Sequence, residues 1–365
     1  MPRMRINIGP IHPSTHGVLR LVVDVNGDTI ENVEPHIGFL HRGVEKLMET
    51  RMYMQNPSYT EKLDYVAPLC WDDMYVAAVE QALGIECKER AQYARTILLE
   101  FQRIASHLLW LGSMCNDMGQ LLTIFCWAFR ERAKVIKLLE DVSGGRMFYV
   151  NLRIGGINQD LPADFVERAG TLVDYLEEKI NGYPEVLEGN PVFMERTKGI
   201  AKLSSGEAIE YGVTGPVLRA SGVEEDVRKS QPYYVYDKVK FKVPTGRNGD
   251  NFDRYKVRYL EMQQSIEIIR QLLQIMPETG EVKGMPIKLI GPNAKPDPVI
   301  IEREMPRGGA MIYMIPDKQR PYRISFRSPT FINLAAVKVL TENLKFADLF
   351  PTVGTLDLVF GEVDR

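Results

Sequence analysis

Residues 86–111 read ECKERAQYARTILLEFQRIASHLLWL, and this stretch decides the fold. Its apolar residues recur at the spacing of one helix face, as Leu98, Phe101, Ile104, Ala105 and Leu108 show. Such a period predicts a long amphipathic helix that buries one side in a core. We therefore expect a helical bundle at the centre of the protein.

Helical patterns also lie on both sides of this stretch. They predict further helices over 72–83, 121–142, 165–180, 253–275 and 330–344. Glycines follow several of them, at Gly84, Gly144 and Gly182, and glycine commonly ends a helix. A shorter helical pattern covers 43–54 and is expected to stop at Pro57.

Strand signals are concentrated elsewhere in the chain. Segments 5–8, 18–25 and 30–33 are strand-like, and Asn26-Gly27 is a strong hairpin signal. Residues 204–244 are rich in Gly, Pro and β-forming residues, so we expect irregular β structure with loops there. Residues 286–327 are expected to form loop and strand.

Together these patterns predict an α+β protein with a small β-rich N-terminal part, a central helical bundle and a β-containing insertion. We divide the chain into an N-terminal β-rich domain (1–57), a helical bundle core (58–203), a β/loop insertion (204–252) and C-terminal helices with a tail that complete the bundle (253–365).

The composition of the 365-residue chain is that of an ordinary globular protein, with a net charge of −3 and 45% hydrophobic residues. The absence of a strongly basic tract argues against nucleic acid as the main partner. The cysteines, at 70, 87, 115 and 126, form no CxxC pair, which argues against a disulfide framework and against a cluster or zinc ion bound by this chain alone. With no secretory leader, a cytoplasmic compartment fits. Polar residues interrupt the apolar stretch 108–129, which favours a buried helix pair over a membrane span.

Histidines cluster near the start of the chain, where four of the five lie between residues 12 and 41. His12 and His16 stand in GPIHPSTHG (9–17), where Pro13 blocks a regular helix and so excludes the helical HExxH zinc motif. Histidine is the side chain best suited to proton transfer near neutral pH. The residues alone leave two possibilities open, turn histidines bonded to backbone or proton donors to a ligand.

Two further groups could take part in proton chemistry. Asp117 lies in an apolar stretch, where it is either a cap at a helix junction or an acid that pairs with a histidine and shifts its pKa. The phenol of Tyr65 can donate a hydrogen bond to a carbonyl group, although most tyrosines serve only in packing.

Arginines form another candidate group, comprising Arg42, Arg146 and Arg153. Arginine stays charged when it is buried and can raise the reduction potential of a nearby cluster. Ordinary salt bridges are the alternative explanation for these residues.

Several motifs together resemble one family, the quinone-site subunit of respiratory complex I. The resemblance begins with GPIHPSTHGVLRL (9–21), PHIGFLHRGVEKL (35–47) and LDY (63–65). It continues in collinear order through the remaining chain, with RIASHLLWLG (103–112), SGGRMFYVNLRIGG (143–156), GVTGPVLRASGVEEDVRK (212–229), DRYKVRYLEMQQSIEII (253–269) and GTLDLVFGEVDR (354–365).

The resemblance implies a fold like the large subunit of nickel–iron hydrogenases, with the metal cavity turned into the closed end of a quinone chamber. It implies that His16 and Tyr65 hydrogen-bond the quinone headgroup and that Asp117 partners the histidine. Arg42 matches an arginine close to the cluster of a neighbouring subunit. The other residues expected around the ligand or the cluster are His12, Arg146, Arg153, Met52, Leu63 and Phe125.

The resemblance also implies partners and a location. The terminal iron–sulfur cluster would be carried by a small neighbouring subunit, other subunits would complete the peripheral arm, and a membrane-arm subunit would line the quinone entrance. The chain would lie peripherally at the cytoplasmic face of the cell membrane, or the equivalent organelle face, in a proton-translocating complex. NADH, ferredoxin and reduced deazaflavin remain open as electron donors.

Two alternative functions remain. A nickel–iron hydrogenase-like subunit would hold its metal with two CxxC pairs, but 36–47 and 352–365 contain no cysteine, so this alternative is disfavoured. A peripheral-arm scaffold would not touch the substrate, and substitutions at His16 and Asp117 would then harm assembly rather than turnover.

Overall fold

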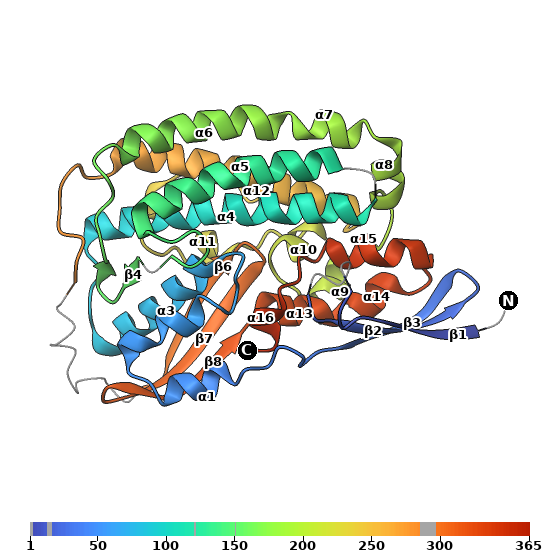
Figure 1. Ribbon diagram of the computed structural model, residues 1–365, viewed down its shortest axis with the longest axis horizontal. Coiled ribbons are helices and arrows are strands. Elements are labelled where there is room, and N and C mark those ends of the chain that lie inside the picture. The colour runs from blue at the N-terminus through green and yellow to red at the C-terminus, as the bar shows by residue number, and fades with distance from the viewer. Residues whose placement is uncertain (1–2, 13–16, 120–121, 150, 285–296) are drawn as a thin grey trace.

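The computed structural model describes residues 3–12, 17–119, 122–149, 151–284 and 297–365. A layer of long helices lies over one antiparallel sheet, and a second sheet extends to one side (Figure 1). This arrangement confirms the α+β class with a central helical bundle and a small N-terminal sheet.

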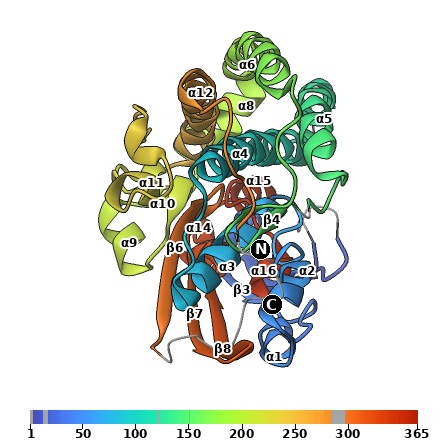
Figure 2. The ribbon, with the colours of Figure 1, turned by 90° about the vertical axis from the view of Figure 1, so that its left-hand side faces the viewer.

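The helical layer contains α4 (Glu89–Asp117), α5 (Leu122–Ser143), α6 (Phe165–Asn181) and α12 (Asn251–Ile275). Each packs against its neighbours in the bundle, which Figure 2 shows above the strands β6, β7 and β8. The predicted helix over 86–111 is confirmed, and it runs on to Asp117 because no residue breaks it before Gly119, which has a φ of +74°. The apolar stretch 108–129 thus comprises the end of α4 and the start of α5. No helix in the described part of the chain is both long and apolar enough for a membrane crossing.

The N-terminal sheet contains β1 (Arg3–Ile8), β2 (Arg20–Asn26) and β3 (Thr29–His36) in antiparallel order. The predicted strands and the hairpin at Gly27 are confirmed, with a φ of +68° at this glycine. Buried residues of these strands share one hydrophobic core with residues of 201–218 and 334–363. The four-part domain division stays a prediction, and this core joins segments from all four of its parts.

The sheet beneath the helical layer contains β6 (Val299–Met305), β7 (Gly308–Asp317) and β8 (Arg320–Arg327). Helix α3 (Pro68–Leu83) packs against β6 and β7, and α1 (Val44–Glu49) packs against β8. The tight turn between β6 and β7 carries Arg307. A Cβ atom on Gly215 would lie 2.2 Å from the Cα of Gly308. Only glycine at 215 therefore lets this turn lie so close to the helix that begins at Gly215.

The prediction of β structure over 204–244 was wrong. The described residues there form α9 (Ser205–Glu210), α10 (Gly215–Ala220), α11 (Val227–Ser230) and the 3-10 turn η3 (Tyr236–Lys238). The side chain of Ser204 accepts from the backbone N–H of Glu207, and Asp226 caps α11 in the same way. These local caps outweighed the β-propensity of the segment.

The C-terminal region also differs in detail from the prediction. The helix expected over 330–344 is interrupted at Ala336 and forms α13 (Pro329–Ala335) and α14 (Val337–Thr341).

Pro57 begins a helix rather than only ending one, since proline is favoured in a first turn. The remaining short elements are η2 (Tyr53–Gln55), α2 (Pro57–Thr60), β4 (Leu152–Arg153), β5 (Gly156–Ile157), α7 (Tyr183–Glu188), α8 (Pro191–Thr197), η5 (Phe346–Asp348), α15 (Leu349–Gly354) and α16 (Phe360–Val363).

Candidate functional site

A pocket of about 250 Å³ opens where segments far apart in the sequence meet. Its walls come from the loop after α2, one face of α4, the start of α5, the β6–β7 turn and the C-terminal tail. Three of the predicted site residues, Tyr65, Asp117 and Phe125, line it together. The other lining residues are Val66, Leu109, Trp110, Ser113, Asn116, Arg307, Asp357, Leu358 and Val359.

Helix periodicity explains the wall made by α4. Trp110, Ser113 and Asp117 are three and four residues apart, so they share one helix face. Gly112 lets α5 come close, because a Cβ atom there would lie 3.4 Å from the Cα of Phe125. The Phe125 ring stacks on Phe129 with centroids 4.3 Å apart, and the pocket therefore has an aromatic side.

The loop that carries Tyr65 is shaped by its neighbour Asp64. One carboxylate oxygen of Asp64 accepts from the backbone N–H groups of Val66 and Ala67, at 3.0 and 3.1 Å. Burial raises the pKa of the Tyr65 phenol, and the negative charge of Asp64 raises it further. Tyr65 therefore stays protonated at neutral pH and is available as a hydrogen-bond donor.

The opposite wall of the pocket is ionic. Arg307 is buried and donates through Nη1 to the carboxylate of Asp64 and through Nε to the backbone oxygen of Asp357, at 3.1 Å. Its Nη2 lies 3.5 Å from Oδ1 of Asp357. The Asp357 backbone is in the left-handed region, with φ of 57°, which is uncommon for a residue other than glycine and is typical of functional sites.

This combination of walls suits one kind of ligand. Val66, Leu109, Trp110, Phe125 and Leu358 offer apolar surface, whereas the phenol and the ionic groups offer contacts to polar atoms. Pockets of this composition take mainly apolar ligands whose few polar atoms are held in place.

Other predicted site residues lie outside this pocket. His16 falls outside the described residues. His12 is exposed, and its ring stacks on Phe350 with centroids 5.6 Å apart. Arg42 donates to the backbone oxygens of Lys62 and Gly361, each at 3.2 Å, and so joins the Tyr65 loop to the C-terminal tail.

The remaining predicted residues are also placed away from the pocket lining. Arg146 is exposed, with its Nε 3.8 Å from Glu140, and Arg153 is partly buried in the short strand β4. Leu63 is fully buried in the main core, whereas Met52 is half exposed. Phe125 is thus the member of the expected apolar wall that lines the pocket.

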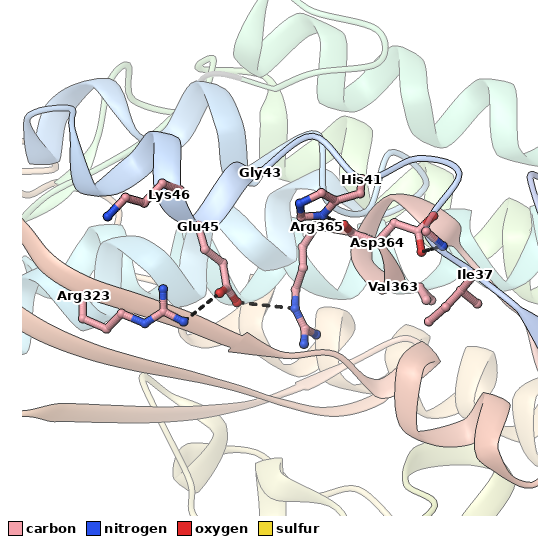
Figure 3. A pocket seen from close by; sticks show the side chains of 10 residues that line it. Ile37, His41, Gly43, Glu45, Lys46, Arg323, Val363, Asp364 and Arg365 are labelled. Carbon is pink, nitrogen blue, oxygen red and sulfur yellow. Dashed lines mark hydrogen bonds and ion pairs between the residues drawn. The ribbon is translucent and has the colours of Figure 1, made fainter.

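A second pocket, of about 390 Å³, lies where the 35–47 motif meets the end of the chain (Figure 3). The carboxylate of Asp364 accepts from the N–H groups of Gly38 and Leu40, both at 2.8 Å. Glu45 lies between Arg323 and Arg365, at 3.2 and 3.4 Å. These groups pair mainly with each other, so this pocket is a junction that fixes the tail against the motif.

Potential metal ligands do not gather in the part of the chain that the structure describes. No three side chains of His, Cys, Asp or Glu there are placed to hold a metal ion together. The cysteines are unpaired, with Cys70 and Cys115 buried and Cys126 exposed.

Comparison with known proteins gives the class. The family model described as the 49 Kd subunit of respiratory-chain NADH dehydrogenase matches residues 117–296 and 287–365. The chain belongs to this family of complex I subunits, whose fold is like that of the hydrogenase large subunit.

Relatives of high similarity carry a more particular name, since each is described as the same subunit of an NADH-quinone oxidoreductase. The protein of Dehalococcoides mccartyi (strain 195) is 45% identical over 361 residues, 99% of this chain and 98% of the relative. That of Desulforamulus reducens is 44% identical over 360 residues, 98% and 97% of the two chains. That of Geotalea uraniireducens is 42% identical over 385 aligned positions, 99% and 98% of the two chains. The chain is accordingly a subunit of a complex I-type oxidoreductase, as its motifs predict.

Proposed function

We propose that this chain forms the quinone site of its complex and that the pocket of Tyr65 and Asp117 receives the quinone headgroup. The observation that carries the proposal is the meeting of a protonated phenol, a carboxyl group and aromatic walls in one pocket. The names of the relatives support it, since they denote oxidoreductases that act on quinone.

The residues of the pocket have distinct roles in this proposal. Reduction of a quinone to a quinol takes two electrons and two protons. Tyr65 donates its hydroxyl proton toward one ligand oxygen, and Asp117 poises a second donor, for which His16 is the candidate. Trp110 and Phe125 hold the ring and exclude water, which strengthens the polar contacts. Electrons come from an iron–sulfur cluster on a small neighbouring subunit.

The same proposal includes the wider setting of the chain. We place it peripherally at the cytoplasmic face of the membrane, beside other peripheral-arm subunits and a membrane-arm subunit at the quinone entrance, in a proton-translocating complex. NADH is the electron donor named in the relatives. Ferredoxin and reduced deazaflavin are the alternative donors. Each of the three would deliver its electrons through other subunits. The scaffold alternative predicts that changes in the pocket alter assembly only.

Filling the pocket tests the proposed function. Ser113→Phe adds a ring to the α4 wall, so we expect the KM for a short-chain quinone to rise about 10-fold or more, because the headgroup loses its space. The measurement is quinone-reductase kinetics of the assembled membrane complex with subunit content checked.

A matched control adds similar bulk elsewhere. Thr171→Phe lies at a surface pocket between α5 and α6 and should leave the KM unchanged. An unchanged KM in an intact Ser113→Phe complex would move the headgroup away from this pocket.

A further inference from the structure

Three buried carboxyl groups act on Arg307, which itself lines the pocket. They belong to Asp64, Asp357 and Glu362, whose exposed fractions are 0%, 7% and 1%. Arg307 itself is only 1% exposed. Burying charge is costly unless each group is paired, so the balance of charges in this cluster matters.

The carboxyl groups do not share Arg307 equally. Asp64 accepts directly from Nη1, whereas Nη2 lies 3.5 Å from Asp357. The oxygens of Glu362 accept instead from Nε1 of Trp71, at 2.9 Å, and from the N–H of Thr330, at 3.1 Å. Glu362 thus has neutral donors but forms no ion pair with any described residue.

Further charged groups face the cluster from other elements. Arg258 of α12 is buried, and its charge interacts with that of Asp357. Its guanidinium lies 4.4 Å from the centre of the Trp110 ring. Arg42, in the loop before α1, acts electrostatically on Tyr65, as do Asp64 and Glu362. Among the described residues, the three buried carboxyl groups therefore face two buried arginines.

The excess of buried carboxyl groups over buried arginines favours keeping one carboxyl group protonated. Burial raises the pKa of Asp64, and burial followed by the charge of Asp64 raises the pKa of Glu362 to about 7. When buried carboxyl groups repel one another, the proton belongs to the pair rather than to either residue. Near neutral pH the pair Asp64 and Glu362 therefore holds about one proton.

Two members of the cluster, Asp64 and Glu362, are electrostatic neighbours of Tyr65. Asp64 precedes Tyr65 in the chain, and a Cβ atom on Gly361, next to Glu362, would lie 3.2 Å from Cε1 of the Tyr65 ring. Arg42 ties Gly361 to Lys62. Asp357 and Tyr65 line the same pocket, where water can bridge two polar groups.

We infer that Asp64 and Glu362, which lie beside Asp357, store one proton behind Tyr65 and return it to the phenolate after Tyr65 has protonated the ligand. The inference rests on the proposed function. The O–H bond of Tyr65 breaks as an O–H bond forms on the reduced ligand, and a carboxyl O–H bond then breaks as the phenol re-forms. The cluster, now one charge more negative, takes up a proton from solvent through the pocket.

The pH profile of turnover tests this store. In the assembled wild-type complex, kcat for quinone reduction should fall above about pH 7, as the cluster loses its proton. Glu362→Gln removes the carboxyl group whose pKa is raised to about 7, so we expect kcat to be about 10-fold lower at pH 6 and nearly flat with pH, with the KM unchanged. Glu362→Asp keeps a titrating carboxyl group and should restore the alkaline fall. Glu178→Gln, on the exposed side of α6, is the control and should behave as wild type.

A second variant guards against failed assembly of the first. Asp357→Asn removes a negative neighbour that raises the pKa of Asp64, so the pair should lose its proton more easily and the alkaline fall should move toward acid pH. Wild-type profiles in intact Glu362→Gln or Asp357→Asn complexes would overturn the inference. If Tyr65→Phe also kept full turnover, the proposed function itself would fail, which separates the two outcomes.

Discussion

Replacing Tyr65 by phenylalanine is expected to lower quinone-reductase turnover about 100-fold or more in a complex that still assembles. The variant keeps the ring and its packing against Gly361 but loses the hydroxyl that the pocket holds protonated. Because a positioned acid contributes to the transition state, the loss should fall on kcat more than on the KM. The measurement is steady-state turnover of purified membrane complex.

Subunit content and a matched variant separate chemistry from folding. Tyr322→Phe removes an exposed hydroxyl on β8 and should leave turnover unchanged. Full turnover in an intact Tyr65→Phe complex would remove Tyr65 from the reaction and leave this chain as a scaffold.

Replacing Arg219 by leucine is expected to destabilise the fold by about 3–5 kcal/mol, the usual cost of breaking a buried ion pair from one side. Arg219 is fully buried and holds Glu261 and Glu304, each at 2.8 Å. Burial alone would raise the pKa of Glu261, yet Arg219, helped by His107, keeps it well below its usual range. Without the arginine, both carboxyl groups stay buried with a direct ion-pair partner removed, and Glu261 keeps only its contact with His107.

The effect is measured by heating the protein and monitoring the unfolding of this subunit by its susceptibility to limited proteolysis. Arg196→Leu breaks the partly exposed pair with Asp348 and should cost only about 1 kcal/mol or less. Equal protection of the Arg219→Leu and Arg196→Leu variants on heating would show that the buried pairs contribute little. A double variant that also replaces Glu261 by leucine should recover part of the loss.

The long helices could be predicted because their apolar residues keep one period over many turns. Three of these helices end near Gly84, Gly119 and Gly144, which adopt the left-handed backbone conformation. Over 204–244 the same reasoning failed, because one capping serine or aspartate starts a short helix without any apolar period. Buried arginines such as Arg219 also have no signal in a hydrophobic pattern, since their partners are far away in sequence.

The pocket was predictable only in part, for a similar reason. Tyr65 and Asp117 were found through family motifs, and the structure brings them to one pocket. Arg307 and Asp357 were missed, although the tail motif contains Asp357. The contact of Arg307 with Asp64 depends on the β6–β7 turn meeting a loop that lies 243 residues earlier in the chain. Local sequence gives no sign of such a contact.

The most direct test of a quinone pocket at Tyr65 is photolabelling of the intact complex with a short-chain photoreactive quinone, followed by mass spectrometry of this subunit. We expect label on peptides that contain residues 65–66, 109–117 or 357–359, and unlabelled quinone should suppress it. Label confined to other subunits, or label on this chain that excess quinone does not reduce, would contradict the assignment.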